Sequence, residues 1–375
     1  MSSESVIERI SPHTIKKFEL IEEYVKAWAH KLLQNQLCQG VVFIDCMCNS
    51  GEYIDVDRNK VFGTPIRVAK ILRDVAGQYP HKQISIYFND KDKDKVRHLQ
   101  SLLGKDKDNF HIHLSVGDGN SLLGDLYPRL QKHPRVHSLL IYDPYDAQID
   151  WNAIMPFLNN WGEVIINHMV SDSVRAVGVV KSRDAVAKYE QTYQVDIQQL
   201  IPYANDKQAY EKRIEDIIKA LRINTKRKYY IAAVPFFNKR NALLYNLIHC
   251  TSNLAGFKLY KSSAWKIFGG KSSIKDTHGQ EKQMCLDFEG IGGPHNITDT
   301  SCYYIQDIAE FIQRHFAGQK NVDVKRVWNL LDEHPIFPSD GFKKEIKQAL
   351  KNFYGAQLHG QSSISFAKGG KQCLK

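Results

Sequence analysis

The sequence has no long apolar run and few cysteines. No stretch approaches the roughly 18 apolar residues that a membrane-spanning helix needs. The first residues, MSSESVIERISPHT, lack the apolar core of a secretory signal. The seven cysteines are an odd number spread over 375 residues, which does not fit a disulfide framework. We therefore expect a cytoplasmic, reduced protein that does not enter a membrane, with Cys46 and Cys48 as buried thiols.

Internal repeats and compositional extremes are also absent. Hydrophobic residues make up 43%, charged residues 25% and aromatic residues 11% of the chain, which excludes wholesale disorder, collagen-like repeats and a coiled-coil rod. The net charge of +10 is compatible with a phosphate-rich partner, but many plain soluble proteins carry such a charge. At about 150 residues per domain, the length favours two domains or one large domain with an insertion.

Short apolar strands alternate with helices over the first half of the chain. Residues 12–33 place apolar side chains on one face at helical spacing and predict a long helix. The strands that we expect next are 41–46, 84–88, 110–116, 137–143 and 163–168, and the helices are 64–76, 92–103, 119–131 and 149–160. This alternation predicts a parallel sheet that is covered on both faces. Two further strands, 229–234 and 242–250, are joined by a segment too short for a crossover helix, so they should pair antiparallel.

The remaining segments differ in character from the alternating part. The polar, helix-rich composition of residues 171–225 predicts a helical insertion. The composition of residues 266–302 predicts a loop or linker. Three short helices are expected within 303–354, which suggests a small helical or winged-helix module. The division that we expect is an N-terminal helix packed on the sheet (1–36), an α/β domain (37–265), the linker (266–302) and a C-terminal region (303–375).

The turn after the first strand is the first candidate for cofactor binding. In parallel sheets the ligand lies beyond the carboxyl ends of the strands. Here that turn offers Asp45, Cys46, Asn49 and Gly51, and Asn is the non-glycine residue that best accepts left-handed backbone geometry. The dinucleotide fingerprint G-x-G-x-x-G is absent. Taken alone, this turn fits a cofactor loop and a plain connection equally well.

Two more acidic residues follow the next two strands. Asp90, at the end of 84–88, is placed to accept hydrogen bonds from both hydroxyls of a ribose, although an acidic residue here also serves as a helix N-cap, for which Asp92 is the better candidate. Asp118 lies between glycines, where it can accept from an adenine amino group or form an ordinary turn. We expect Asp90→Ala to weaken cofactor binding and to leave the fold intact.

The fourth strand ends in the peptide YDPYD. Asp143, Pro144 and Tyr145 resemble the Asp/Asn-Pro-Pro-Tyr element of amino-group methyltransferases. In that element a carboxylate or amide oxygen holds the target amine, proline fixes a turn that aims a carbonyl at it, and the aromatic ring stacks on the base. The second proline is missing here. We take these three residues as the catalytic candidates.

Signals at the ends of four successive strands favour a cofactor-binding α/β domain. The missing G-x-G and the terminal antiparallel hairpin favour S-adenosyl-L-methionine over NAD. A nuclease or other hydrolase that uses Asp45, Asp55 and Asp57 with a metal ion is a weaker hypothesis. The peptide GEYIDVD (51–57) is expected to lie in a loop, and no His-carboxylate spacing supports a site. We expect no metal.

Several peptides together resemble the three-Cys-motif partner (TcmP) proteins, a prokaryotic family with a class I methyltransferase-like fold. These peptides are PHTIKKFELIEEYVKAW, FIDCMCNSGEY, GTPIRVA, IYFNDKD and YDPYD. The family's first motif has the form Asp-x-Phe-Ala-Gly-x-Gly. In this sequence its defined positions are occupied, in order, by Asp45, Met47, Cys48, Asn49 and Gly51. Its acidic residue after the second strand matches Asp90. Its Asp-Pro-Tyr/Phe-Gly matches Asp143 to Tyr145, with Asp146 in place of glycine. The match covers residues 12–265.

This resemblance implies a Rossmann-like, seven-stranded class I methyltransferase sheet with a helical insertion and a C-terminal winged-helix-like module. It also implies S-adenosyl-L-methionine as cofactor and a partner, a three-Cys-motif protein that resembles radical enzymes. Two functions stay open. One is an N-methyltransferase that acts on a nucleic-acid base or a related amine. The other is a catalytically degenerate protein of the same fold that binds nucleic acid or a protein partner.

The last helix of the C-terminal region carries the candidate contacts to nucleic acid. Its apolar face is expected to hold Phe342, Ile346, Ala349, Leu350 and Phe353. The lysines of the remaining surface are Lys343, Lys344, Lys347 and Lys351. They form either an ordinary solvated face or a set of phosphate contacts, as in a helix of a winged-helix module.

Overall fold

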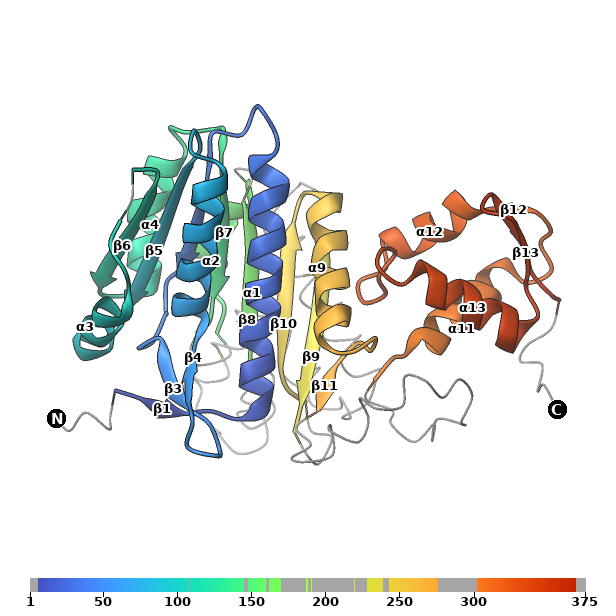
Figure 1. Cartoon of the computed structure of the whole chain (residues 1–375), viewed down its shortest axis with the longest axis horizontal. Helices are drawn as coiled ribbons and strands as arrows, with labels where there is room; N and C mark the ends of the chain where they lie inside the picture. The colour runs from blue at the N-terminus through green and yellow to red at the C-terminus, as the bar shows by residue number, and fades with distance from the viewer. Residues whose placement is uncertain are drawn as a thin grey trace.

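The computed structural model describes residues 6–368, except 107, 145–147, 160–161, 170–227 (apart from three isolated positions), 239–242 and 276–301. Within these residues the chain forms a large α/β domain, and a smaller C-terminal module lies beside it (Figure 1). Tyr145, nearly all of the expected insertion and most of the expected linker lie outside the described residues. No helix in the described ranges has both the length and the apolar character needed to cross a membrane.

The central sheet has the strand order β11-β9-β10-β8-β7-β2-β5-β6. The bounds are β2 (Gly40–Asp45), β5 (Gln83–Asp90), β6 (Phe110–Val116), β7 (Val136–Tyr142), β8 (Glu163–His168), β9 (Tyr230–Phe237), β10 (Leu243–Thr251) and β11 (Ile274–Lys275). Adjacent strands pair in parallel except β10, which is antiparallel to both neighbours. Apart from the short edge strand β11, this is the seven-stranded sheet of class I methyltransferases, and the predicted antiparallel pair is confirmed.

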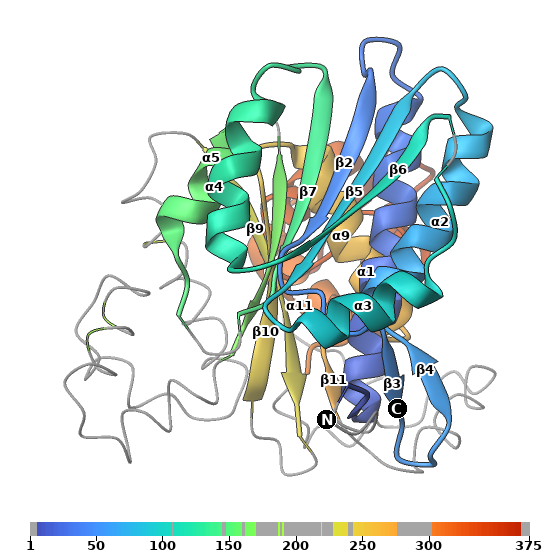
Figure 2. The ribbon, with the colours of Figure 1, turned by 90° about the vertical axis from the view of Figure 1, so that its left-hand side faces the viewer.

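Helices cover both faces of the sheet (Figure 2). One face carries α1 (Pro12–Leu33), α2 (Thr64–Gln78) and α9 (Leu254–Ile267). The other face carries α4 (Gly119–Leu130) and α5 (Trp151–Asn159). The helix α3 (Lys93–Leu102) connects β5 to β6. Alternate residues of a strand point to opposite faces. Accordingly, Val41 and Phe43 join the core under α1 and α2, and Val42 and Ile44 join the core under α4 and α5. Both faces of β2 are therefore buried, as its continuous apolar run predicts.

A small second sheet lies at the carboxyl edge of the main one. Residues 51–57, expected to be a loop, contain β3 (Glu52–Ile54), which pairs antiparallel with β4 (Lys60–Phe62). The strand β1 (Glu8–Arg9) pairs in parallel with β3. The loop prediction was wrong because strands of two or three residues leave no periodic pattern to read. This pairing places residues 8–17 over the edge where β2 and β7 end.

The C-terminal module has the order of elements found in winged-helix domains. It consists of α11 (Ile305–Phe316), β12 (Val322–Asp323), α12 (Val324–Asp332), α13 (Lys343–Tyr354), β13 (Gln357–His359) and β14 (Ser363–Ser365). Its strands form an antiparallel sheet of order β12-β14-β13. Ile346, Ala349 and Leu350 of α13 are buried as predicted, whereas Phe353 is 38% exposed and the next residue, Tyr354, is buried instead.

Buried polar contacts attach this module to α9. The ammonium of Lys261 donates to the carbonyls of Leu331 (2.9 Å) and His334 (2.7 Å) at the end of α12. The indole of Trp265 donates to the carbonyl of Ile336 at 3.0 Å and is almost fully buried. The Leu331 carbonyl also accepts from the His334 amide at 3.1 Å, so Lys261 adds further hydrogen bonds at the end of α12 and finds acceptors there for its own buried ammonium.

Candidate functional site

A cavity of about 420 Å³ lies at the point where the strand order reverses. The chain runs from β2 outward to β5 and β6 and then returns to β7 on the other side of β2. In sheets of this kind the crevice at such a point binds ligands. The sheet edge contributes Asp45, Met47, Cys48, Asn49, Ile141 and Asp143 to the lining, and the N-terminal segment contributes Glu8, Arg9, Ile10, Ser11, Thr14 and Lys17. This volume is in the range of small-molecule sites.

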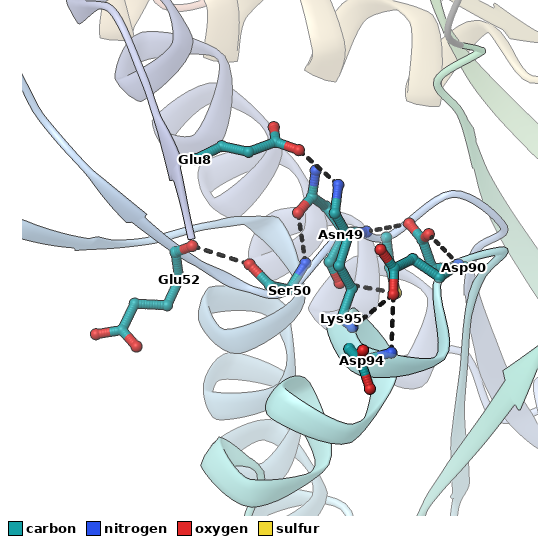
Figure 3. Close-up of polar contacts among 9 residues, drawn as sticks. Glu8, Asn49, Ser50, Glu52, Asp90, Asp94 and Lys95 are labelled. Carbon is teal, nitrogen blue, oxygen red and sulfur yellow. Dashed lines mark hydrogen bonds and ion pairs between the residues drawn. The ribbon is translucent and has the colours of Figure 1, made fainter. Parts of the chain in front are cut away.

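The turn after β2 has left-handed backbone geometry at two positions. Asn49 has φ 60° and Gly51 has φ 77°. The Asn49 side-chain oxygen accepts from the Ser50 amide at 2.6 Å, which stabilises the turn locally (Figure 3). A Cβ on Gly51 would lie only 2.7 Å from Cδ1 of Leu99. Asn49 thus takes the conformation that a glycine would otherwise supply, and Gly51 is required by both its φ and its surroundings.

Asp90 connects this turn to the turn after β5. Its carboxylate is almost fully buried and accepts from the backbone amides of Asn49 and Asp92, each at 2.9 Å (Figure 3). The neighbouring Asn89 amide donates to the carbonyls of Cys46 (3.0 Å) and Gly117 (2.9 Å). The turns after β2, β5 and β6 are therefore held together by two adjacent side chains.

The structure brings only part of the predicted site to the cavity. Asp45, Asn49 and Asp143 line it, whereas Cys46, Gly51, Asp90, Asp118 and Pro144 are not among its described lining residues.

Two of the residues away from the lining have structural partners. Asp118 caps α4 by accepting from the Ser121 amide at 3.0 Å, lies 3.3 Å from the Lys91 ammonium and is 46% exposed. Cys46 is fully buried with its thiol 3.6 Å from the carbonyl of Ile141. The ribose, adenine and catalytic roles of the candidates stay predictions.

Asp143 is held from two sides. Its Oδ1 accepts from the side-chain amide of Asn167 on β8 at 2.6 Å, and its Oδ2 accepts from the Lys17 ammonium of α1 at 2.9 Å. Sequence reasoning missed both partners. Lys17 looks like any lysine of an amphipathic helix, and Asn167 ends a buried strand, so only the packing of α1 and β8 around β7 reveals them.

Asp45 is the most perturbed carboxyl group of the cavity. Burial, and next the negative charge of Asp143, raise its pKa to about 7, while the Met47 amide and the Lys17 ammonium act in the opposite direction. A carboxyl group with such a pKa in a ligand-sized cavity is a feature of functional sites. It also makes the stability of the protein depend on pH.

The variant Asp45→Asn tests that dependence. The folded pKa of Asp45 lies above the value of about 3.9 in an unfolded chain, so its contribution to stability is fully present below about pH 4 and is lost as the pH rises through about 7. Wild-type protein should therefore lose about 2–3 kcal/mol between pH 5 and pH 8 that the variant keeps. Urea unfolding of both proteins at the two pH values measures this, and parallel pH profiles would contradict it.

The metal-ligand candidate Asp55 and the two cysteines of the first turn have structural surroundings in the described ranges. No group of three or more His, Cys, Asp or Glu residues there is placed to hold a metal ion. Asp55, one of the metal-ligand candidates, accepts instead from the amides of Asp57 and Asn59 in the β3–β4 turn. Cys46 and Cys48 are buried free thiols, as predicted, and burial raises the pKa of both.

Comparison with known proteins finds similar folds among solved structures. No family model and no curated protein matches the sequence. Human methyltransferase-like protein 13 in complex with SAH aligns with a TM-score of 0.32 at 9% identity, covering 72% of this chain and 99% of that one. A DUF574 family protein from Streptomyces avermitilis aligns at 0.31 and 10% identity, covering 62% and 82%. Loganic acid methyltransferase with SAH aligns at 0.30 and 10% identity, covering 72% and 85%. At TM-scores this low the fold assignment depends on the strand order and not on these likenesses.

Proposed function

We propose that this protein is an S-adenosyl-L-methionine-dependent methyltransferase that acts on a nitrogen of a nucleic-acid base or a related amine. The observation that carries the proposal is the cavity at the topological switch point, which brings Asp45 and Asn49 together with Asp143. Two carboxylates and a turn with positive φ suit a ligand that carries an ammonium and a sulfonium group. When bound, this cofactor supplies an electrophilic methyl group.

The residues of the chain would act mainly by positioning. The carboxylate of Asp143 and the carbonyl of Pro144 would hold the acceptor nitrogen and stabilise the positive charge that grows on it. Asn167 fixes the orientation of the Asp143 carboxylate through its 2.6 Å hydrogen bond. Asp45 would complement the positive charge of the cofactor from the end of β2.

Calorimetric titration of the purified protein with S-adenosylmethionine and with S-adenosylhomocysteine tests the proposal. We expect binding at micromolar concentrations. Asn49→Gly should keep this binding because glycine accepts a φ of 60°, whereas Asn49→Val should abolish it because a β-branched residue is strained there. No heat of binding at millimolar ligand, with the folded state confirmed by circular dichroism, would contradict a cofactor site.

The C-terminal module supports the choice of a nucleic-acid substrate. On α13 the side chains of Lys343, Lys344 and Lys351 are exposed and Lys347 is half-buried, opposite the buried face of the helix. Lys343 pairs with Asp340 at 2.7 Å, which leaves the other three lysines as the stronger candidates for phosphate contacts. Phosphate contacts would add affinity and salt dependence but no sequence preference.

Replacing Lys343, Lys344, Lys347 and Lys351 together by alanine should weaken nucleic-acid binding. The slope of log affinity against log salt should become shallower by about one for each phosphate that the variant no longer neutralises. Fluorescence anisotropy with a labelled duplex at several salt concentrations measures both quantities. The matched control removes four exposed lysines of the α/β domain: Lys26, Lys31, Lys70 and Lys93. Equal effects of the two sets would mean that only overall charge matters.

A binding module without turnover is the second candidate function. Both oxygens of Asp143 already have partners, and the carboxylate of Asp90 is used by the backbone. Such a protein would bind nucleic acid but would transfer no methyl group to it. The three-Cys-motif partner protein that the resemblance implies stays a prediction.

A further inference from the structure

The ammonium of Lys17 lies at the carboxylate that is the candidate holder of the acceptor amine. Its Nζ is 2.9 Å from Oδ2 of Asp143 and 5.6 Å from the ring centroid of Tyr245. Only 12% of the Lys17 side chain is exposed, and it lines the same cavity as Asp45 and Asp143. An amine of the protein therefore already occupies an oxygen that a substrate amine would need.

The Lys17 ammonium reduces the negative charge that Asp45 and Asp143 bring to the cavity. The Lys17 side chain reaches from α1 to the sheet edge, where burial, and next the negative charge of Asp143, raise the pKa of Asp45. Of the other charged lining residues, Glu8 is paired with Lys95 and Arg9 lies on an exposed strand. With both aspartates ionised, the pair plus Lys17 carries a net charge of −1, and without Lys17 it carries −2.

We infer that Lys17 is a resident cation that competes with cationic ligands for the Asp45–Asp143 pair and thereby sets the preference of the site between S-adenosylmethionine and S-adenosylhomocysteine. This inference rests on the proposed function. The two molecules differ by one methyl group and one positive charge. A competing cation opposes the sulfonium and has little effect on the neutral thioether. The same ammonium must leave Asp143 when an acceptor amine enters.

A purely structural role for Lys17 makes a different prediction. If the ion pair only attaches α1 to the sheet, its loss would loosen the N-terminal wall of the cavity. The affinities for both ligands would then fall by similar factors. The ratio of the two dissociation constants separates the two roles, because it cancels any effect that the ligands share.

The test is calorimetric titration of three variants with both ligands. In Lys17→Met, affinity for S-adenosylmethionine should rise about tenfold and affinity for S-adenosylhomocysteine should change less than about threefold, as expected for one charge-assisted contact. Lys17→Arg keeps the charge and should keep the wild-type ratio. Lys16→Met is the control, because Lys16 pairs with Glu19 on α1 and does not line the cavity. An unchanged ratio in Lys17→Met would overturn the inference.

A ligand-free measurement separates failure of this inference from failure of the proposed function. If neither ligand binds any variant, the proposed function fails. Urea unfolding of Lys17→Met still tests whether the Lys17 ammonium offsets the repulsion between Asp45 and Asp143. The charged groups that face Asp45 are Asp143, Lys17 and Asp90. The other titratable groups near it have raised pKa values because they are buried; they are Cys46, Cys48 and Tyr53. Without Lys17 the two ionised aspartates repel, so Lys17→Met should be more destabilising at pH 8 than at pH 5. An equal loss at both pH values would mean a structural contact alone.

Discussion

Asp143→Ala should lower the rate of methyl transfer by about 10²–10³-fold, the usual cost of removing one preorganised group that stabilises charge in a transition state. Asp143 lies on the cavity at the end of β7 and is fixed by Asn167 and Lys17, so its carboxylate is preorganised before any substrate enters. Transfer of labelled methyl groups from S-adenosylmethionine to genomic DNA and total RNA measures the rate. Affinity for the cofactor should change much less than the rate.

Asp143→Asn is the matched control for this prediction. An amide keeps one oxygen that can accept from an acceptor amine, and Asn is the alternative residue in the Asp/Asn-Pro-Pro-Tyr element that this peptide resembles. It loses the charge that pairs with Lys17. Its rate should therefore lie between those of wild-type protein and Asp143→Ala. Full activity in Asp143→Ala would show that the acceptor is held elsewhere.

Asp90→Ala should destabilise the fold by about 2–4 kcal/mol as well as weaken cofactor binding. The substitution removes the charged acceptor of the Asn49 and Asp92 amides. A hydrogen bond to a charged group contributes about 1.5–3 kcal/mol, and the bond to the exposed Asp92 should contribute less than the bond to Asn49. The structure thus revises the expectation that this variant would keep its fold intact. Urea unfolding and calorimetric titration measure the two effects.

Asp118→Ala provides the comparison for Asp90. Asp118 is an exposed N-cap of α4, and removal of such a cap costs about 1 kcal/mol. Its loss should leave the turn after β2 in place. If both variants lose the same stability, the Asp90 carboxylate does not hold the two turns together.

Elements with a strong local pattern could be predicted from the sequence alone. The helix at Pro12–Leu33 begins and ends where its apolar spacing indicated, and β2 is a strand buried on both faces as its uninterrupted apolar run required. The antiparallel pairing of β9 and β10 followed from the short connection between them. By contrast, β1, β3 and β4 have two or three residues each, and strands so short form only because each finds a partner.

The candidate site divides in the same way. The residue types at the strand ends and the order of those strands are properties of the sequence, and together they predict that Asp45, Asn49 and Asp143 lie at one edge of the sheet. The identity of their partners depended on tertiary structure. Lys17 meets Asp143 across 126 residues, and Asp90 turns toward the backbone of Asn49. Local spacing determines which face of an element is apolar, but a side chain's partner is decided by which elements pack together, and no local pattern encodes that packing.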